Sequence, residues 1–321
     1  MSLPVCFAPL EGVTDSAYRR IHHAHFSGIS KYYIPFISPT QTLTMTTREL
    51  SNISPEYNTG VPVVPQVLTR NADHFIWAAQ QLYDMGHEEV NLNTGCPSGT
   101  VTAKGKGAGM LAHVPELEIF LDEIFSRSPM PVSIKTRIGY ASADEFDRLL
   151  ELFSRYPVKE LIIHPRTREQ FYKGTPHRDV YAQALKNTHL PVIYNGDLFT
   201  AESCHIFEQN YPGTKALMIG RGLLANPALA QAYAGGTPLT LETLRAFHDD
   251  LLREYLERYP KNVVVARLRE VMKNIACSFE NNAKPLKAVR KASNLAQYED
   301  AVNRLFDECP LSAVPQFIPE T

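Results

Sequence analysis

The 321-residue sequence contains only five cysteines, all far apart and none in a CxxC pair. This scarcity excludes a recognisable zinc motif and a disulfide framework. No apolar run approaches the roughly 18 to 20 residues that a membrane-spanning helix requires, and the first residues lack the basic segment and apolar core of a secretory signal. We therefore expect a cytoplasmic protein with no metal and no membrane partner, and we take a monomer as the working expectation.

The chain also lacks a strong charge of either sign. Its 32 basic and 34 acidic residues give a net charge of -2, and 44% of its residues are hydrophobic. This composition is ordinary for a globular protein with a sizeable core. It argues against attraction of nucleic acid to the whole surface, but it is compatible with a local basic patch.

Short apolar segments recur through the first two thirds of the chain, each followed by a turn and a stretch of helical period. Three of these helical stretches are 72–85, 114–127 and 144–156. The alternation predicts a parallel sheet, and eight units favour a (β/α)8 TIM barrel. An open doubly wound sheet is the alternative if some strands are miscounted. The expected strands are 5–10, 32–38, 62–68, 89–95, 131–137, 160–166, 191–197 and 216–222.

The pattern changes near Gly235, after which no strand-like run follows. We predict a barrel domain over residues 1–235 and a small all-helical domain over 236–321, with helices at 241–259, 263–281 and 286–306. Basic residues outnumber acidic ones between 261 and 291. Such a run is commonly a solvated face, but next to a nucleotide-directed site it would bind RNA phosphates.

Polar and glycine residues cluster at the carboxyl ends of the expected strands, where βα barrels place their active sites. A Lys inside a strand is costly to bury without an anion or electron-rich partner, so Lys135 indicates a bound ligand, for which a reduced flavin is suitable. Glycines after strands seven and eight lie where barrels commonly bind phosphate. Purely structural interpretations are also open: Lys135 or Gln66 could pair with a barrel carboxylate, and the glycines could form simple tight turns. The candidate residues are Pro9, Leu10, Gln66, Asn93, Cys96, Lys135, His164, Arg166, Asn195, Gly196, Asp197, Gly220 and Arg221.

Cys96 follows the fourth expected strand and precedes a segment rich in Gly and Lys. Most cysteines are buried and inert, but one on an active-face loop is a candidate acid or nucleophile. We expect this loop to be accessible and mobile. The other four cysteines keep the inert interpretation.

These motifs together resemble the tRNA-dihydrouridine synthase family. The resemblance covers most of the first 230 residues in order: Ala-Pro-Leu-Glu-Gly-Val-Thr-Asp from Ala8, Asn-Thr-Gly-Cys-Pro from Asn93, Lys-Thr-Arg from Lys135, His-Pro-Arg-Thr from His164, Asn-Gly-Asp from Asn195 and Gly-Arg-Gly from Gly220. It implies FMN as cofactor, NADPH as reductant and a uridine in the tRNA D-loop as substrate.

The resemblance also implies residue roles. Pro9, Leu10 and Gln66 would contact the flavin ring, and Lys135 and His164 the flavin and its side chain. The phosphate end would lie at Asn195, Gly196, Asp197, Gly220 and Arg221. Asn93 and Arg166 would contact the substrate, and Cys96 would be the catalytic acid.

Two positions depart from the family pattern. The family commonly has a Lys two to four residues after the catalytic Cys, whereas the first one here is Lys104. The usual Met of the opening motif is Leu10, an apolar exchange that keeps contact with a ring.

The implied reaction adds a hydride to C6 of uracil and a proton to C5, with Cys96 as general acid on a base flipped out of the tRNA. Two other functions fit parts of the sequence. One is a flavin oxidoreductase acting on a free pyrimidine, as dihydroorotate dehydrogenases do. The other is a tRNA-binding module that has lost catalysis.

Overall fold

Nine parallel strands form the centre of the computed structural model, which describes residues 2–312 and 314. They run in the order β3-β2-β1-β9-β8-β7-β6-β5-β4. The two strands at the ends of this order, β3 and β4, are separated in sequence only by Pro65. β3 pairs with β2, and β4 pairs with β5. The sheet therefore closes into an eight-membered barrel. The strands are β1 Val5–Phe7, β2 Ile29–Tyr33, β3 Val63–Val64, β4 Gln66–Val67, β5 Val90–Thr94, β6 Val132–Arg137, β7 Leu161–His164, β8 Val192–Asn195 and β9 Ala216–Ile219.

The predicted TIM barrel is confirmed, with two corrections in its strands. The second strand was placed at 32–38 but runs from Ile29 to Tyr33. It ends ahead of Pro35, which has no N–H to donate to a ladder. Beyond it only Ile37 makes a further bridge, to Val67. The third strand, predicted as one segment, is split at Pro65 for the same reason.

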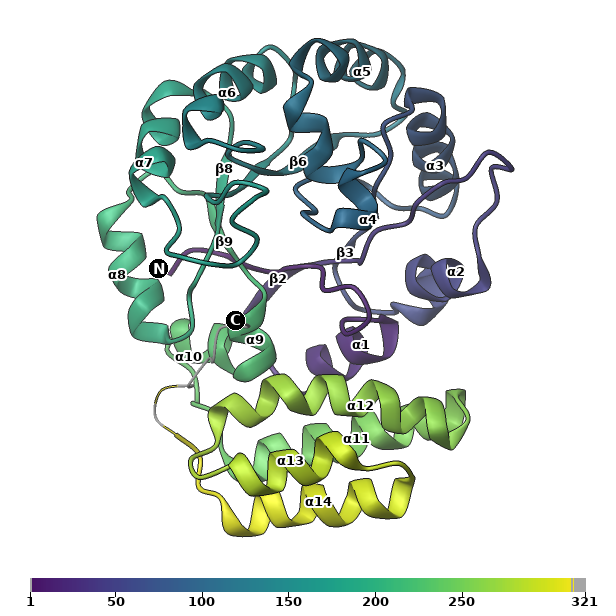
Figure 1. Ribbon diagram of the computed structural model, residues 1–321, viewed down its shortest axis with the longest axis vertical. Helices are drawn as coiled ribbons and strands as arrows, with labels where there is room; N and C mark the ends of the chain where they lie inside the picture. Colours follow the sequence, from purple (N-terminus) through teal and green to yellow (C-terminus); the bar gives the residue numbers. More distant parts are fainter. Residues whose placement is uncertain (1, 313, 315–321) are drawn as a thin grey trace.

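A ring of helices surrounds the strands (Figure 1). In α6, Phe146, Leu149, Leu150 and Phe153 recur at three- and four-residue spacing and are all buried against the sheet. The helices Ala72–Asp84 and Val114–Arg127 follow the same pattern, and the main core lies between helices and strands. The outer helices are α1 Ser16–His25, α2 Thr47–Ile53, α3 Ala72–Asp84, α5 Val114–Arg127, α6 Phe146–Ser154, α7 Arg178–Asn187 and α8 Ala201–Asn210, followed by the short α9 Arg221–Ala225 and α10 Leu229–Tyr233.

The inside of the barrel is apolar on one side and polar on the other. A separate cluster from β1, β2, β3, β7, β8 and β9 includes Tyr33, Ile162, Ile193 and Met218. The inward positions of β4, β5 and β6 instead carry amides, a hydroxyl and an ammonium group: Gln66, Asn91, Asn93, Ser133 and Lys135. Both sides run the length of the barrel, so the polar side connects its two ends.

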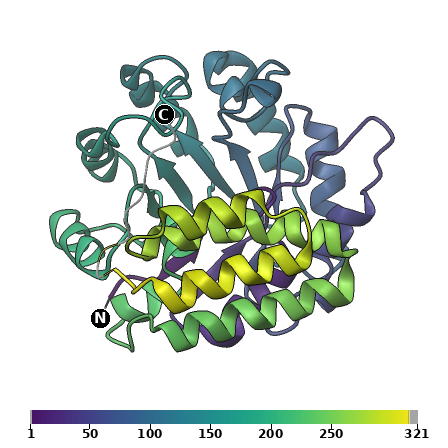
Figure 2. The same ribbon diagram turned by 60° about the horizontal axis from the view of Figure 1, so that its bottom comes forward.

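Four helices follow the barrel and pack together beside it, as Figure 2 shows. They are α11 Leu241–Arg258, α12 Lys261–Ile275, α13 Ala283–Lys291 and α14 Leu295–Glu308. The first two agree with prediction near their starts, but α12 ends six residues earlier than the expected 281. The expected helix 286–306 is wrong, since Asn294 caps a new helix with its side chain and divides the segment into α13 and α14.

Asp15 joins the helical part to the barrel. Its carboxylate caps α1 through Tyr18 N and also accepts from Tyr255 Oη at 3.1 Å and Arg267 Nη1 at 2.6 Å. Arg267, counted among the RNA-directed charges in the sequence, is thus used within the protein. The domain boundary at 235/236 stays a prediction, and residues 313 and 315–321 of the expected second domain lie outside the described part. No helix in the described ranges is long and apolar enough to cross a membrane.

Candidate active site

A cavity of about 280 Å³ opens at the carboxyl ends of the strands, which we call the barrel mouth. Gln66 reaches it from β4, Asn93 from β5, Lys135 from β6 and His164 from the end of β7. Because parallel strands all end at the same rim, four residues spread over a hundred positions meet in one space. The predicted candidates in its wall are Pro9, Leu10, Gln66, Asn93, Cys96, Lys135 and His164.

A second, narrower cavity of about 70 Å³ adjoins the first. The two share Pro9, Leu10, Lys135, His164 and Tyr172 as lining residues. Beyond these, the narrow cavity is lined by the predicted phosphate group, Asn195, Gly196, Asp197, Gly220 and Arg221. The structure therefore brings every predicted site residue except Arg166 to the wall of one continuous slot.

Lys135 lies between the two cavities, and its ammonium group has no hydrogen bond or ion pair to any other described residue. Desolvation lowers the pKa of its ammonium group to about 7, and the charge of Arg137 adds to the effect, while Cys96 opposes it. A cation in this position lacks an electron-rich partner. The sequence left open a carboxylate partner for Lys135, but no described carboxylate pairs with its ammonium group. This ammonium group therefore suits an acceptor edge of a bound ligand.

His164 is held by its neighbour Arg166. Nη1 of Arg166 lies 3.1 Å from His164 Nε2. A guanidinium can only donate, so Nε2 accepts and the ring proton of the neutral imidazole sits on Nδ1. Burial first, and then the charges of Arg137 and Lys135, keep the pKa of His164 well below its usual value, which makes the ring neutral.

Arg166 itself is 1% exposed and lines neither cavity. Its guanidinium binds both oxygens of Asp197, at 2.5 and 3.2 Å, and the carbonyl of Gly174 at 2.6 Å. Asp197 also accepts from Arg221 Nη2 at 2.6 Å. The geometry therefore places Arg166 behind the wall, where it supports His164 and Asp197. The substrate contact expected for it remains a prediction.

The segment after Cys96, expected as an accessible and mobile loop, contains two short helices, and Gly99, Thr100, Ala103 and Lys104 in it are exposed. It forms α4 Gly99–Thr102 and the 3-10 helix η2 Gly107–Ala112, and the carbonyl of Cys96 accepts from Ala108 N at 3.0 Å. Gly107 has a φ of +57°, and a Cβ there would lie 2.8 Å from the Cys96 carbonyl oxygen. Glycine is therefore required at this turn, and Cys96 is held at the cavity wall in a half-buried position.

The glycines of the narrow cavity have structural roles of their own. A Cβ on Gly222 would lie 2.1 Å from the carbonyl oxygen of Leu198, and one on Gly196 would lie 2.2 Å from Tyr194 Oη. Both positions exclude a side chain because the backbone packs against the protein itself. The phosphate role assigned from the sequence is compatible with this packing, but the close contacts have a sufficient cause without it.

Two wall residues were given no role in the sequence analysis. Tyr172 borders both cavities, with Arg221 5.0 Å and Arg137 5.5 Å from its ring centroid. Arg137 is buried and donates to the carbonyls of Gly95, Thr167 and Phe171, which fixes the loops after β5 and β7. The spacing of Lys135 and Arg137, two residues apart on one strand, placed them on one face and could have identified Arg137.

A third hollow, of about 370 Å³, lies between the mouth and the C-terminal helices. Leu10, Glu11, Tyr172 and Arg221 line it from the barrel side. From the helices it is lined by Glu270, Lys273, Asn274, Cys277, Asn282, Leu286 and Arg290. The slot thus continues into a groove between the barrel and α12–α13.

Residues 6–314 match the model of the family described as dihydrouridine synthase. The chain belongs to this family. The family predicted from the sequence is confirmed, and with it the enzyme class.

Similar proteins cover most of this dihydrouridine synthase. A "Probable tRNA-dihydrouridine synthase" of Rhodobacter capsulatus is 28% identical over 296 residues, which is 89% of each chain. "tRNA-dihydrouridine synthase B" of Pasteurella multocida is 27% identical over 229 residues, 70% of this chain and 67% of that protein. Among solved structures, morphinone reductase superposes with a TM-score of 0.53 at 14% identity, over 76% of this chain and 90% of that one. This last likeness concerns the barrel fold alone.

Proposed function

We propose that the protein reduces a uridine in the D-loop of tRNA to 5,6-dihydrouridine, with FMN as its cofactor and NADPH as its reductant. The observation that carries the proposal is the single slot in which Cys96, Gln66, Asn93, Lys135 and His164 meet. Family membership supports the reaction, and the names of the two relatives support tRNA as the substrate.

The slot is lined by side chains that suit the chemistry of a flavin. Its wider part lies beside the Lys135 ammonium, which has no protein partner among the described residues and would donate to the acceptor edge of the ring. Its narrow part carries Arg221 and the backbone of Gly220, suited to a phosphate. Pro9 and Leu10 supply apolar contact to both parts. When bound there, FMN would supply a hydride from N5 to C6 of the uracil.

Cys96 would complete the reaction by donating its thiol proton to C5 of the uracil. Cys96 lines the cavity, and its backbone is fixed by hydrogen bonds with Asn93 and Ala108. Asn93, next to it, would hold a uracil carbonyl. His164 with its proton on Nδ1 can donate to the cofactor without carrying a charge.

The RNA would lie across the groove between the barrel and α12–α13. Lys273 and Arg290 border the groove, and Lys284, Lys287 and Lys291 lie exposed at positions i, i+3 and i+7 of α13, hence on one face. Phosphate contacts from such residues give affinity without base specificity. They would offset the cost of unstacking the target base.

The test compares Cys96→Ala with wild-type protein on unmodified tRNA. We expect the variant to bind FMN normally and to lose dihydrouridine formation by about 100-fold or more, the scale of general acid catalysis. Cys204→Ala, which removes a buried thiol from α8, is the matched control and should retain activity. Undiminished turnover by Cys96→Ala would remove Cys96 from the mechanism.

The same preparation distinguishes the other functions. Reduction of free uridine without salt-dependent tRNA binding would indicate a small-molecule oxidoreductase. Protein that cannot take up FMN would indicate a binding module. Mapping dihydrouridine position by position in tRNA, with and without the gene, would identify the modified site.

A further inference from the structure

Five buried polar side chains form a continuous hydrogen-bonded chain through the polar side of the barrel. From the amino-terminal end upward they are Glu89, Ser133, Asn91, Gln66 and Asn93. The successive distances are 2.7 Å from Ser133 Oγ to Glu89 Oε1, 2.9 Å from Asn91 Nδ2 to Ser133 Oγ, 2.8 Å from Gln66 Nε2 to Asn91 Oδ1, and 2.7 Å from Asn93 Nδ2 to Gln66 Oε1. The chain thus joins the mouth to the opposite face of the barrel.

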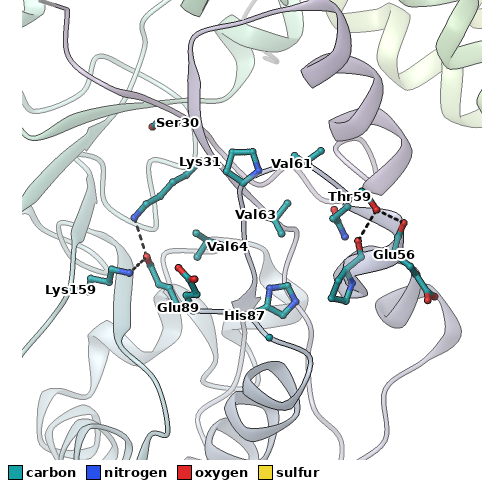
Figure 3. A pocket seen from close by; sticks show the side chains of 16 residues that line it. Ser30, Lys31, Glu56, Thr59, Val61, Val63, Val64, His87, Glu89 and Lys159 are labelled. Atoms are coloured by element: carbon teal, nitrogen blue, oxygen red, sulfur yellow. Dashed lines mark hydrogen bonds and ion pairs between the residues drawn. The ribbon is translucent and has the colours of Figure 1, made fainter.

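Its lower end is a carboxylate that can only accept. Lys31 Nζ at 3.0 Å and Lys159 Nζ at 2.8 Å both donate to Glu89 Oε2, as Figure 3 shows. Burial raises the pKa of the Glu89 carboxyl, but hydrogen bonds from Lys159 and Ser133 and the charge of Lys31 outweigh burial, and the net pKa lies below its usual value. Glu89 is therefore ionised, and Ser133 must donate to it.

Its upper end is fixed by two groups that can only donate. Oδ1 of Asn93 accepts from the peptide N–H of Gly95 at 3.0 Å and from that of Cys96 at 2.9 Å. The amide nitrogen of Asn93 must then face Gln66. Because each donor needs an acceptor opposite, the direction of every amide in the chain follows from either end, and the two ends agree.

We infer that this chain is a positioning device that orients the Gln66 and Asn93 amides, so that Asn93 presents an N–H rather than a carbonyl to the cavity. Three of the four hydrogen-bonding positions of the Asn93 amide are used by Gly95, Cys96 and Gln66, and the one left is an Nδ2–H. The site would therefore select a ring with a carbonyl oxygen at that point. It would reject one with an exocyclic amino group there, since two donors would face each other.

This selectivity rests on the proposed function, but the hydrogen-bonded chain of side chains can be tested without substrate. Asn93→Asp keeps both acceptor contacts to the peptide N–H groups and places a second acceptor against Gln66 Oε1. The side-chain amides of Gln66 and Asn91 must then each rotate by about 180°. Ser133 must donate its hydroxyl proton to Asn91, which leaves Glu89 without that donor. Glu89→Gln would repair this reversed chain, because its amide can donate to Ser133.

The experiment is a double-mutant cycle on apo-protein, read as the unfolding equilibrium constant in denaturant at pH 8. We expect Asn93→Asp to be destabilising alone, and its cost to fall by about tenfold or more in the equilibrium constant when Glu89→Gln is present, the scale of one buried unsatisfied polar group. Glu89 and Asn93 are four residues apart along a strand, about 13 Å, so direct contact cannot produce this coupling. Additive effects would overturn the inference.

The matched control is Glu160→Gln. Glu160 belongs to the same charge cluster, accepting from Lys31 Nζ at 2.7 Å and Tyr33 Oη at 3.0 Å, but it is not in the chain. The effects of Glu160→Gln and Asn93→Asp on the free energy of unfolding should be additive. Equal coupling in both cycles would show that charge alone causes the effect, and it would overturn the inference. If Asn93→Asp alone fails to fold, Glu89→Gln should restore soluble protein while Glu160→Gln should not.

Activity gives a separate readout. The repaired pair, Asn93→Asp with Glu89→Gln, should regain stability without regaining dihydrouridine formation, because the N–H toward the ring is gone. Recovery of activity would refute the role of that N–H. The double-mutant cycle measures unfolding and does not depend on activity toward tRNA. Failure of the proposed function is therefore distinguishable from failure of the inference about the hydrogen-bonded chain.

Discussion

The two ends of the barrel carry similar charged residues, but they differ in whether the positive charges are paired with carboxylates. At the amino-terminal end, Lys31 and Lys159 are both paired with Glu89 (Figure 3). Lys31 is also paired with Glu160. At the carboxyl-terminal end, Asp197 serves both Arg166 and Arg221, and the Lys135 ammonium has no partner among the described residues. A balanced end contributes stability by itself, whereas the unbalanced end is complete only with an anionic or electron-rich ligand.

The largest effect should come from removing the carboxylate of Asp197, which lines the narrow cavity. Asp197→Asn leaves the buried guanidinium of Arg166 without its counter-charge, and we expect the free energy of unfolding to fall by about 3 kcal/mol. Chemical denaturation of the apo-protein measures this. Asp300→Asn, which breaks an exposed pair with Arg304, should cause no measurable change. Equal effects of the two substitutions would show that Asp197 is not a needed counter-charge for Arg166 and Arg221.

Lysine substitutions at the two ends should have opposite signs. Lys135→Met removes an unpaired cation, so the apo-protein should become more stable while FMN affinity falls by roughly 10- to 100-fold, about 2 kcal/mol for a charged hydrogen bond. Lys159→Met removes a donor from Glu89, so stability should fall while FMN affinity stays unchanged. Fluorescence titration and denaturation measure both quantities. The same sign of stability change for both lysines would contradict the comparison.

The smallest effect sharpens the comparison through pH. Because the pKa of Lys135 is lowered to about 7, the ammonium is protonated below that pH and largely neutral above it. Bound flavin favours the protonated form, so binding above pH 7 must take up a proton, and affinity should fall by up to about tenfold per pH unit. Below pH 7 this contribution should be flat. Lys135→Met should lack the slope, and an unchanged slope in that variant would assign it to another group.

Much of the architecture followed from local patterns. Helix 114–127 was predicted at its observed bounds, because its apolar spacing and its early proline are local signals. The second strand and the helix pair α13–α14 were misplaced because proline positions and the Asn294 cap outweighed an apolar pattern that extends across them. The two short helices after Cys96 were not predicted, because their packing depends on a glycine contact with Cys96 itself.

The sequence by itself determined which chemical groups reach the mouth, because strand ends of a βα barrel share one rim and the motifs lie at those ends. Tertiary structure alone decided how those groups are oriented and balanced. Arg166 turned from the slot to hold His164 and Asp197, Asp15 became the link to the helices, and Glu89 was connected to Asn93 through three intervening side chains. Charge balance and hydrogen-bond direction depend on which distant side chains meet, and no local pattern in the chain contains that information.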